Sequence, residues 1–251
     1  MKQVPWFKAS QLLRRIPRQD CHLHSTFSDG KASWQAMVEQ AAKISLEQIT
    51  FTEHVNQTST WVPEYAQTIR RAQQESSFGP QIFLSAEVKA ANITGTPDIN
   101  PEYLRLFDYL VGVIHRYPMN DGGFHRFQDL TPAQAQDIDY SVTRMLILHP
   151  DVDVIGHLGG TFSHYFGEYA PGLLEELVDL AVTHGKVVEL NSNVRYRHQF
   201  ERILQQCLAS DALITLGSDA HTPEELGGCI GQVEQRLEPL VKKGHHVSEK
   251  G

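Results

Sequence analysis

The sequence predicts one α/β domain built on parallel strands, and a closed barrel suits it better than a doubly wound sheet. Short apolar runs alternate with longer amphipathic segments along the chain, which is the pattern of strands joined by right-handed helical crossovers. About seven such units fit a 251-residue chain, a normal size for one α/β barrel. Periodicity alone does not close the ring. No repeat or linker divides the chain, so we expect a single domain over 1–251, with an N-terminal extension (1–18), a barrel core (about 19–230) and a frayed tail (244–251).

The elements follow in order. The candidate strands are residues 19–23, 49–53, 81–86, 108–114, 152–156, 186–190 and 212–217. Helical spacing of apolar residues predicts helices over 34–42, 138–146, 173–181 and 200–207. The stretches TPAQ (131–134) and TPEE (222–225) combine a capping box with proline at the first helical position, so each should begin a helix.

Composition narrows the class of protein. The formal charge is −8 and no basic tract is present, which argues against stable nucleic-acid binding. The three cysteines, Cys21, Cys207 and Cys229, form neither a CxxC pair nor a disulfide framework, as expected in a reducing cytoplasm. The chain has neither a run of about 18 apolar residues nor a signal peptide. We therefore expect a cytoplasmic protein without a membrane partner.

Residues that bind metals or protons gather where the predicted strands end. They are His22, His24 and Asp29 after the first strand, Glu53 and His54, Glu87, His115, His157, and finally Asp219 and His221. Residues two apart on a strand face the same way, so His22 and His24 can point at one ion. Each of these positions alone is more often a hydrogen-bonded structural residue than a ligand.

Their joint placement favours a metal centre. Parallel strands bring all their carboxyl ends to one face, which is where the active sites of α/β barrels lie. So many imidazoles and carboxylates would repel one another or stay unpaired without cations. Nitrogen and oxygen ligands together suit zinc, manganese or iron better than calcium. We therefore predict a site with more than one transition metal.

At this point the sequence resembles the PHP (polymerase and histidinol phosphatase) superfamily of metal-dependent phosphoesterases. The segments that carry the resemblance run in the family's order from residue 20 to about 228: DCHLHSTFSDG, FTEHVN, AEVKA, DYLVGVIH, GHLGG, VVELNSN and ITLGSDAHTPEELG. The set is specific, although no single motif would be. The resemblance implies a distorted, TIM-like (β/α)7 barrel with two or three divalent metals at its mouth.

The resemblance also implies a ligand for every metal position. His22, His24, Glu87 and Asp219 would hold one metal; Glu87 would bridge to a second, completed by His115 and His157; Asp29, His54 and His221 would hold a third. The second motif reads TEH where TDH is common, and GHLGG lacks the proline that often follows this histidine, but neither departure removes a ligand. The complete set argues against a degenerate, structural PHP domain.

The implied chemistry is hydrolysis of a phosphomonoester by a metal-activated water. The metals would outweigh the charge of the acidic ligands and attract the phosphate. Glu87 and Asp219 would act in catalysis through the metals, and His221 or His157 could also protonate the leaving oxygen. Neither a serine nor a cysteine nucleophile is needed.

Arginines near the predicted mouth are candidates for binding the phosphate or the rest of the substrate. Arg195 is the first choice, because histidinol-phosphatase-like members have an arginine in that loop; Arg197 and Arg116 could equally be surface residues. The segment 116–130 is a candidate specificity loop, and His125 or His164 could reach the site or be exposed.

Among substrates, the resemblance to histidinol-phosphate phosphatases makes L-histidinol phosphate, an intermediate of histidine biosynthesis, the best candidate. Two alternatives stay open at this point. One is a nucleotide or oligonucleotide phosphoesterase of the same superfamily, and the other is a metal-binding regulatory domain without turnover.

Overall fold

A computed structural model describes residues 4–75 and 79–248, with side chains except at 197, 198 and 239–248. Its centre is a mixed sheet in the order β1-β8-β7-β6-β5-β4-β3-β2. The strands are β1 Phe7–Lys8, β2 Gln19–Leu23, β3 Gln48–His54, β4 Gln81–Lys89, β5 Tyr109–Val113, β6 Val154–Ile155, β7 Val187–Asn191 and β8 Leu213–Gly217. All the predicted strands are present, and β2 to β8 pair in parallel along the sheet.

The sheet curls so that β2 returns to β8, which confirms the predicted distorted barrel. Leu23 and Ala220 form a parallel bridge just beyond the two strands. The His24 amide donates to the Ala220 carbonyl at 2.8 Å, and the Ala220 amide donates to the His22 carbonyl at 3.2 Å. At the other end of β8, the short strand β1 pairs antiparallel, with Phe7 opposite Ile214. Closure is therefore made beside the carboxyl ends of the strands, where the predicted ligands lie.

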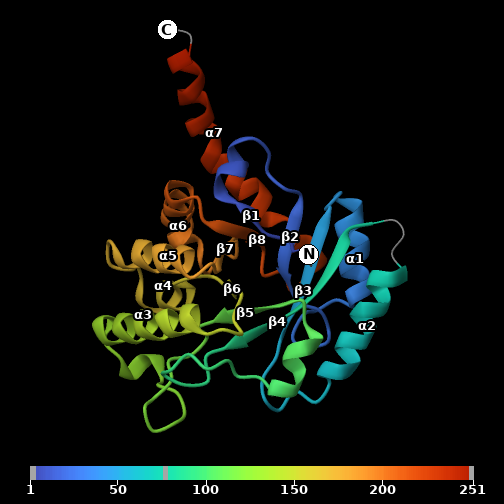
Figure 1. Cartoon of the computed structure of the whole chain (residues 1–251), viewed down its shortest axis with the longest axis vertical. Coiled ribbons are helices and arrows are strands. Elements are labelled where there is room, and N and C mark those ends of the chain that lie inside the picture. Colours follow the sequence, from blue (N-terminus) through green and yellow to red (C-terminus); the bar gives the residue numbers. More distant parts are fainter. Residues whose placement is uncertain (1–3, 76–78, 249–251) are drawn as a thin grey trace.

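Helices surround the sheet. They are α1 Trp34–Lys43, α2 Val62–Glu75, α3 Pro132–Leu148, α4 Gly160–Phe166, α5 Leu173–Thr183, α6 Arg197–Ser210 and α7 Gly228–Ser248, with 3-10 turns η1 Ala9–Leu13, η2 Pro101–Leu106, η3 Phe127–Asp129 and η4 Pro223–Glu225. Figure 1 shows α1 and α2 on one side of the strands and α3 to α6 on the other. No described helix is both long and apolar enough to cross a membrane.

The two predicted capping boxes have different outcomes. At the start of α3, the Thr131 hydroxyl accepts from the Gln134 amide while the Gln134 side chain accepts from the Thr131 amide, so the helix begins as predicted. The box at Thr222 is also formed, but it begins only the short turn η4. Gly227 follows with a φ of +76°, and α7 starts at Gly228.

The two terminal segments lie differently on the barrel. In the N-terminal extension, the Trp6 ring packs edge-on against Tyr109, with 5.3 Å between ring centroids, and so covers the amino ends of the strands. At the other terminus α7 continues to Ser248 and leaves the body of the barrel (Figure 1). The segment expected to fray from residue 244 is therefore helical as far as Ser248, and 249–251 lie outside the described residues.

Candidate metal centre

Side chains from six parallel strands meet at the carboxyl end of the barrel. Three groups have potential ligand atoms within 4.8 Å of one another: His24, Asp29, His54 and His221; His22, His24 and Asp219; and His54, Glu87 and His115. His157 joins them through a 2.8 Å contact between its Nε2 and Glu87 Oε1. The structure thus brings together every residue that the sequence predicts as a ligand.

Glu87 lies at the centre of this cluster, near the end of β4. Its Oε1 is 3.1 Å from His115 Nε2, and its Oε2 is 2.6 Å from His54 Nδ1. Only 1% of its side chain is exposed. Burial alone would raise the pKa of Glu87, but the surrounding imidazoles, His115 foremost, hold it well below its usual range. Glu87 therefore stays ionised and can share its two oxygens between neighbouring cations.

Buried atoms without hydrogen-bond partners show that these residues fit metal ions. Among the described side chains they include His22 Nε2, His24 Nδ1 and Glu87 Oε2. Glu87 Oε2 lies only 2.6 Å from His54 Nδ1, but the direction of this contact is not that of a hydrogen bond. A buried polar atom that lacks a partner costs about 1–3 kcal/mol. Coordination of divalent transition metals would satisfy His22 Nε2 and Glu87 Oε2, and imidazole and carboxylate are suitable donors.

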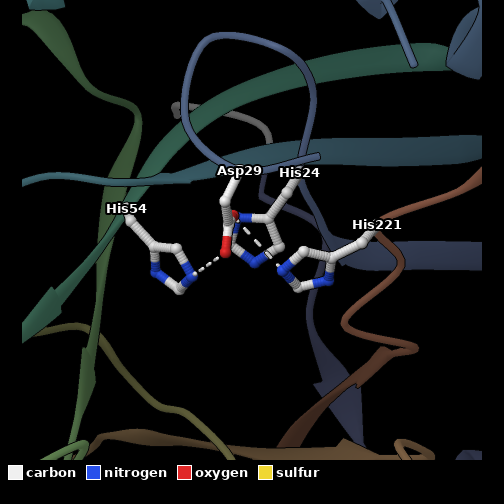
Figure 2. Close-up of side chains that lie close together, drawn as sticks. All are labelled: His24, Asp29, His54 and His221. Carbon is white, nitrogen blue, oxygen red and sulfur yellow. Dashed lines mark ion pairs between the residues drawn. The ribbon is translucent and has the colours of Figure 1, made fainter. Parts of the chain in front are cut away.

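The Asp29 carboxylate lies between two imidazoles at the outer side of the cluster. Figure 2 shows His54 and His221 reaching it from opposite sides, at 3.4 Å to Oδ2 and 3.3 Å to Oδ1. Burial lowers the pKa of His54, but the carboxylates of Glu87 and Asp29 outweigh it and raise the pKa to about 10. Burial raises the pKa of Asp29, yet the same imidazoles hold it below its usual range. Without metal, protons on these histidines balance the acidic charge.

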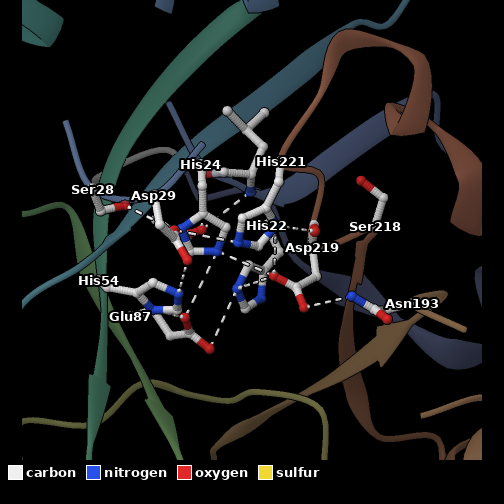
Figure 3. Close-up of polar contacts among 12 residues, drawn as sticks. His22, His24, Ser28, Asp29, His54, Glu87, Asn193, Ser218, Asp219 and His221 are labelled. Atoms are coloured by element: carbon white, nitrogen blue, oxygen red, sulfur yellow. Dashed lines mark hydrogen bonds and ion pairs between the residues drawn. The ribbon is translucent and has the colours of Figure 1, made fainter. Parts of the chain in front are cut away.

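Asp219 follows β8 and presents its two oxygens to different partners. Oδ1 lies 3.1 Å from His24 Nε2, and Oδ2 accepts a 2.9 Å hydrogen bond from Asn193 Nδ2 (Figure 3). The backbone φ is +56° at Asp219 and +25° at His157, a region that non-glycine residues rarely adopt. Such strain persists where surrounding structure enforces it, often at functional sites. Here it affects two of the predicted ligands.

Buried carboxylates behind the cluster hold the candidate ligands in place, and no sequence pattern predicts this role for them. Glu189 Oε1 is 2.6 Å from His22 Nδ1, so His22 turns Nε2 toward the site, while Glu189 Oε2 accepts from the His157 amide at 2.6 Å. A Cβ at Gly217 would collide with this carboxylate. Asp20 accepts hydrogen bonds from the Ser218 and Gly227 amides. Their only signal in the sequence is an acid within an apolar strand.

The predicted substrate-binding residues are less firmly held. Arg116 and Arg195 are exposed, and within the described part of the chain neither guanidinium has a hydrogen bond or ion pair. The Arg195 amide donates to Asn193 Oδ1 at 3.0 Å, which fixes its backbone near Asp219. Arg197 begins α6, but its side chain lies outside the described part. All three stay predictions.

The two further histidines lie away from the cluster's contacts. His125, in the 116–130 segment, lines a cavity of about 730 Å³ against α3, together with Pro118 and Asp121. His164 is exposed on α4, where its ring packs edge-on against Tyr165. No contact places either histidine among the described ligands.

Comparison with known proteins agrees with this geometry. Residues 20–193 match the family model described as "PHP domain". The chain belongs to the PHP domain family. A Thermotoga maritima protein named "Probable histidinol-phosphatase" is 24% identical over 231 residues, covering 87% of this chain and 90% of the relative. An Acetivibrio thermocellus protein named "Probable phosphatase" is 24% identical, covering 83% of this chain and 81% of the relative.

Two solved structures share the PHP fold. One is a histidinol phosphate phosphatase from Lactococcus lactis, in complex with zinc, L-histidinol and phosphate (TM-score 0.66, 20% identity, 90% of this chain and 92% of that chain). The other is a candidate histidinol phosphatase from Listeria monocytogenes (TM-score 0.69, 15% identity, 85% of this chain and 99% of that chain). With this family and a complete set of donors, the PHP protein is a metal-dependent phosphoric ester hydrolase.

Proposed function

We propose that this PHP protein hydrolyses a small phosphomonoester, and that L-histidinol phosphate is the best candidate. The observation that carries the proposal is the arrangement of the potential ligand groups around one buried carboxylate, Glu87, at the open end of the barrel. The similarity to the Thermotoga and Lactococcus proteins supports histidinol phosphate in particular.

The same geometry supports a three-metal assignment. Glu87 would be shared by two metals: His22, His24 and Asp219 would hold one of them, and His115 and His157 the other. Asp29, His54 and His221 would hold the third. Zinc, manganese and iron all suit this mixture of imidazole and carboxylate donors. When bound, these ions would supply positive charge for the phosphate and lower the pKa of a coordinated water.

The protein's own residues would orient the histidine ligands and neutralise the charge of the phosphate. Glu189 holds His22 with Nε2 toward the site. The Nδ1 of His221 lies 2.9 Å from the Asp219 carbonyl and donates to it, which leaves the Nε2 lone pair facing Asp29. His221 therefore suits the role of ligand better than that of proton donor. Arg195, whose backbone is fixed beside Asp219, would bind phosphate oxygens with its guanidinium.

A substrate panel tests the proposal. Purified protein reconstituted with Zn²⁺ or Mn²⁺ is assayed for phosphate release from L-histidinol phosphate, nucleoside monophosphates, short oligonucleotides and sugar phosphates. We expect the highest kcat/KM for L-histidinol phosphate. A kcat/KM for a nucleotide or oligonucleotide about tenfold higher, equal to about 1.4 kcal/mol of transition-state stabilisation, would contradict it and favour the nucleotide phosphoesterase.

A further inference from the structure

The loop that carries Asp29 rests on a buried carboxylate that is not itself a predicted ligand. Residues 25–31 form this loop, the Asp29 loop. Glu53 Oε1 accepts hydrogen bonds from the Ser25 amide at 2.9 Å and from its hydroxyl at 2.5 Å. Its Oε2 accepts from the Ser28 amide at 3.1 Å and from its hydroxyl at 2.5 Å. Both oxygens of Glu53 are thus used to hold one short segment.

The position of Glu53 on β3 explains this division of labour. Neighbouring residues on a strand point to opposite faces. His54 therefore points into the mouth of the barrel, where its ring reaches Asp29 and Glu87, while Glu53 points away from it and under the Asp29 loop. Glu53 is fully buried. One strand end supplies both a ligand and the support of a second ligand.

Further contacts join the Asp29 loop to other parts of the cluster. The Lys31 amide donates to the His221 carbonyl at 2.7 Å. At Gly30 the loop passes so close to the His24 backbone that a Cβ would lie 2.5 Å from the His24 carbonyl oxygen. The Phe27 ring packs on Tyr65, with centroids 5.2 Å apart. Asp29 itself is half exposed and contacts imidazoles, so its place depends on the loop.

We propose that Glu53 is the positioning residue for Asp29, and that it sets the affinity of the outermost metal site, formed by Asp29, His54 and His221. The inference rests on the three-metal assignment made under the proposed function. Glu189 holds His22 and His157, and Asp20 accepts from the Ser218 amide next to Asp219, so the effect should be largest at the outermost site.

Glu53→Gln is the direct perturbation. An amide keeps only one oxygen, so it cannot accept from both serines, and its NH2 group would face an amide hydrogen. Loss of an outer partner of this kind typically weakens metal binding by roughly 10- to 100-fold. In the test, protein freed of metal with a chelator is titrated with Mn²⁺. Calorimetry measures the affinity of each site, and elemental analysis measures the bound metal per chain. We expect three equivalents in the wild type and at least a roughly tenfold weaker third site in Glu53→Gln, with the first two little changed.

A double-mutant cycle separates positioning from general destabilisation. If Glu53 acts through Asp29, Asp29→Asn and Asp29→Asn/Glu53→Gln should bind Mn²⁺ alike, because the second change has nothing left to position. Glu47→Gln is the matched control, since the Glu47 carboxylate is 53% exposed and pairs with Arg15 on the surface. It should titrate as the wild type. If Glu53→Gln does not fold, Ser28→Ala removes the hydroxyl that lies 2.5 Å from Glu53 Oε2 and 3.4 Å from Asp29 Oδ1, and it should weaken the same site to a smaller extent.

The outcomes distinguish the two proposals. If the wild type and Glu53→Gln both bind three metals with the same affinities, the role of Glu53 is overturned but the three-metal assignment is not. Equal weakening of all sites, or a double variant that loses clearly more than Asp29→Asn, does the same. A wild type that binds fewer than three metals overturns the three-metal assignment, and the role of Glu53 with it.

Discussion

Replacement of Glu87 by glutamine removes one negative charge from the buried centre of the site. Its side chain is 1% exposed, and its oxygens contact His115, His157 and His54 at 3.1, 2.8 and 2.6 Å. Glutamine has nearly the same shape, so the pocket need not collapse. It offers one oxygen and an NH2 donor, however, where the carboxylate offers two acceptors. The change therefore acts on charge and coordination rather than on packing.

The expected loss of metal affinity in Glu87→Gln follows from the charge that is removed and from its buried surroundings. Two unit charges about 4 Å apart interact by about 4 kcal/mol at an effective dielectric constant of about 20. The amide hydrogens would be buried without an acceptor, at a further cost of about 1–3 kcal/mol. Because a tenfold change corresponds to about 1.4 kcal/mol, metal affinity should fall by at least about a thousandfold. Turnover should fall with it at limiting metal concentration.

Metal content and turnover of Glu87→Gln are measured on the same preparation. Elemental analysis gives bound metal per chain, and an aryl phosphate gives kcat across a range of added Zn²⁺ or Mn²⁺. Glu87→Asp serves as the comparison, because it keeps the charge on a shorter side chain and should lie between the wild type and glutamine. Near-normal turnover of Glu87→Gln with its full metal complement would refute the bridging role of Glu87.

Two further predictions concern the phosphate and the pH dependence. Arg195→Ala should keep its metals but lose roughly one to three powers of ten in kcat/KM, because it loses one charge-assisted contact and some orientation of the substrate. Arg195→Lys should recover only part of this loss. Wild-type rates for Arg195→Ala, together with a large loss of activity in Arg116→Ala or Arg197→Ala, would assign phosphate binding to one of those arginines instead. Since the pKa of His54 is raised from 6.5 to about 10 in the metal-free fold, its stabilising effect is complete below about pH 6.5 and is lost as pH rises through about 10. The Tm values of metal-free wild type and metal-free His54→Gln should therefore converge as the pH rises through this window. A difference in Tm that stays constant with pH would contradict the ion pairs of His54.

The meeting of the candidate ligands could be predicted from the sequence because most of them follow one simple rule. Apart from Asp29, which lies on the loop after β2, each is a His, Asp or Glu near the carboxyl end of an apolar strand, and parallel pairing forces these ends together. His157, for example, follows β6, and Glu87 lies near the end of β4. The apolar runs also gave the approximate bounds of β2 to β8. Local pattern and global fold agree for these elements.

Other features depend on contacts between distant segments, which have no local pattern. Strand β1 has only two residues and exists because β8 offers it an edge. Glu53 and Glu189 look like any acid in a strand, and their roles appear only when Ser28 and His22 are placed beside them. The TPEE box is formed, yet only the short turn η4 follows it, and Gly227, with a φ of +76°, separates this turn from α7.

Stepwise return of metal to chelated protein tests the metal-dependent hydrolysis most directly. Inorganic phosphate released from an aryl phosphate is measured against the equivalents of Zn²⁺ or Mn²⁺ bound per chain. The groups around Glu87 predict no turnover without metal, and full turnover only with more than one equivalent bound. Full activity in the chelated protein, or with at most one equivalent, would contradict a multinuclear site.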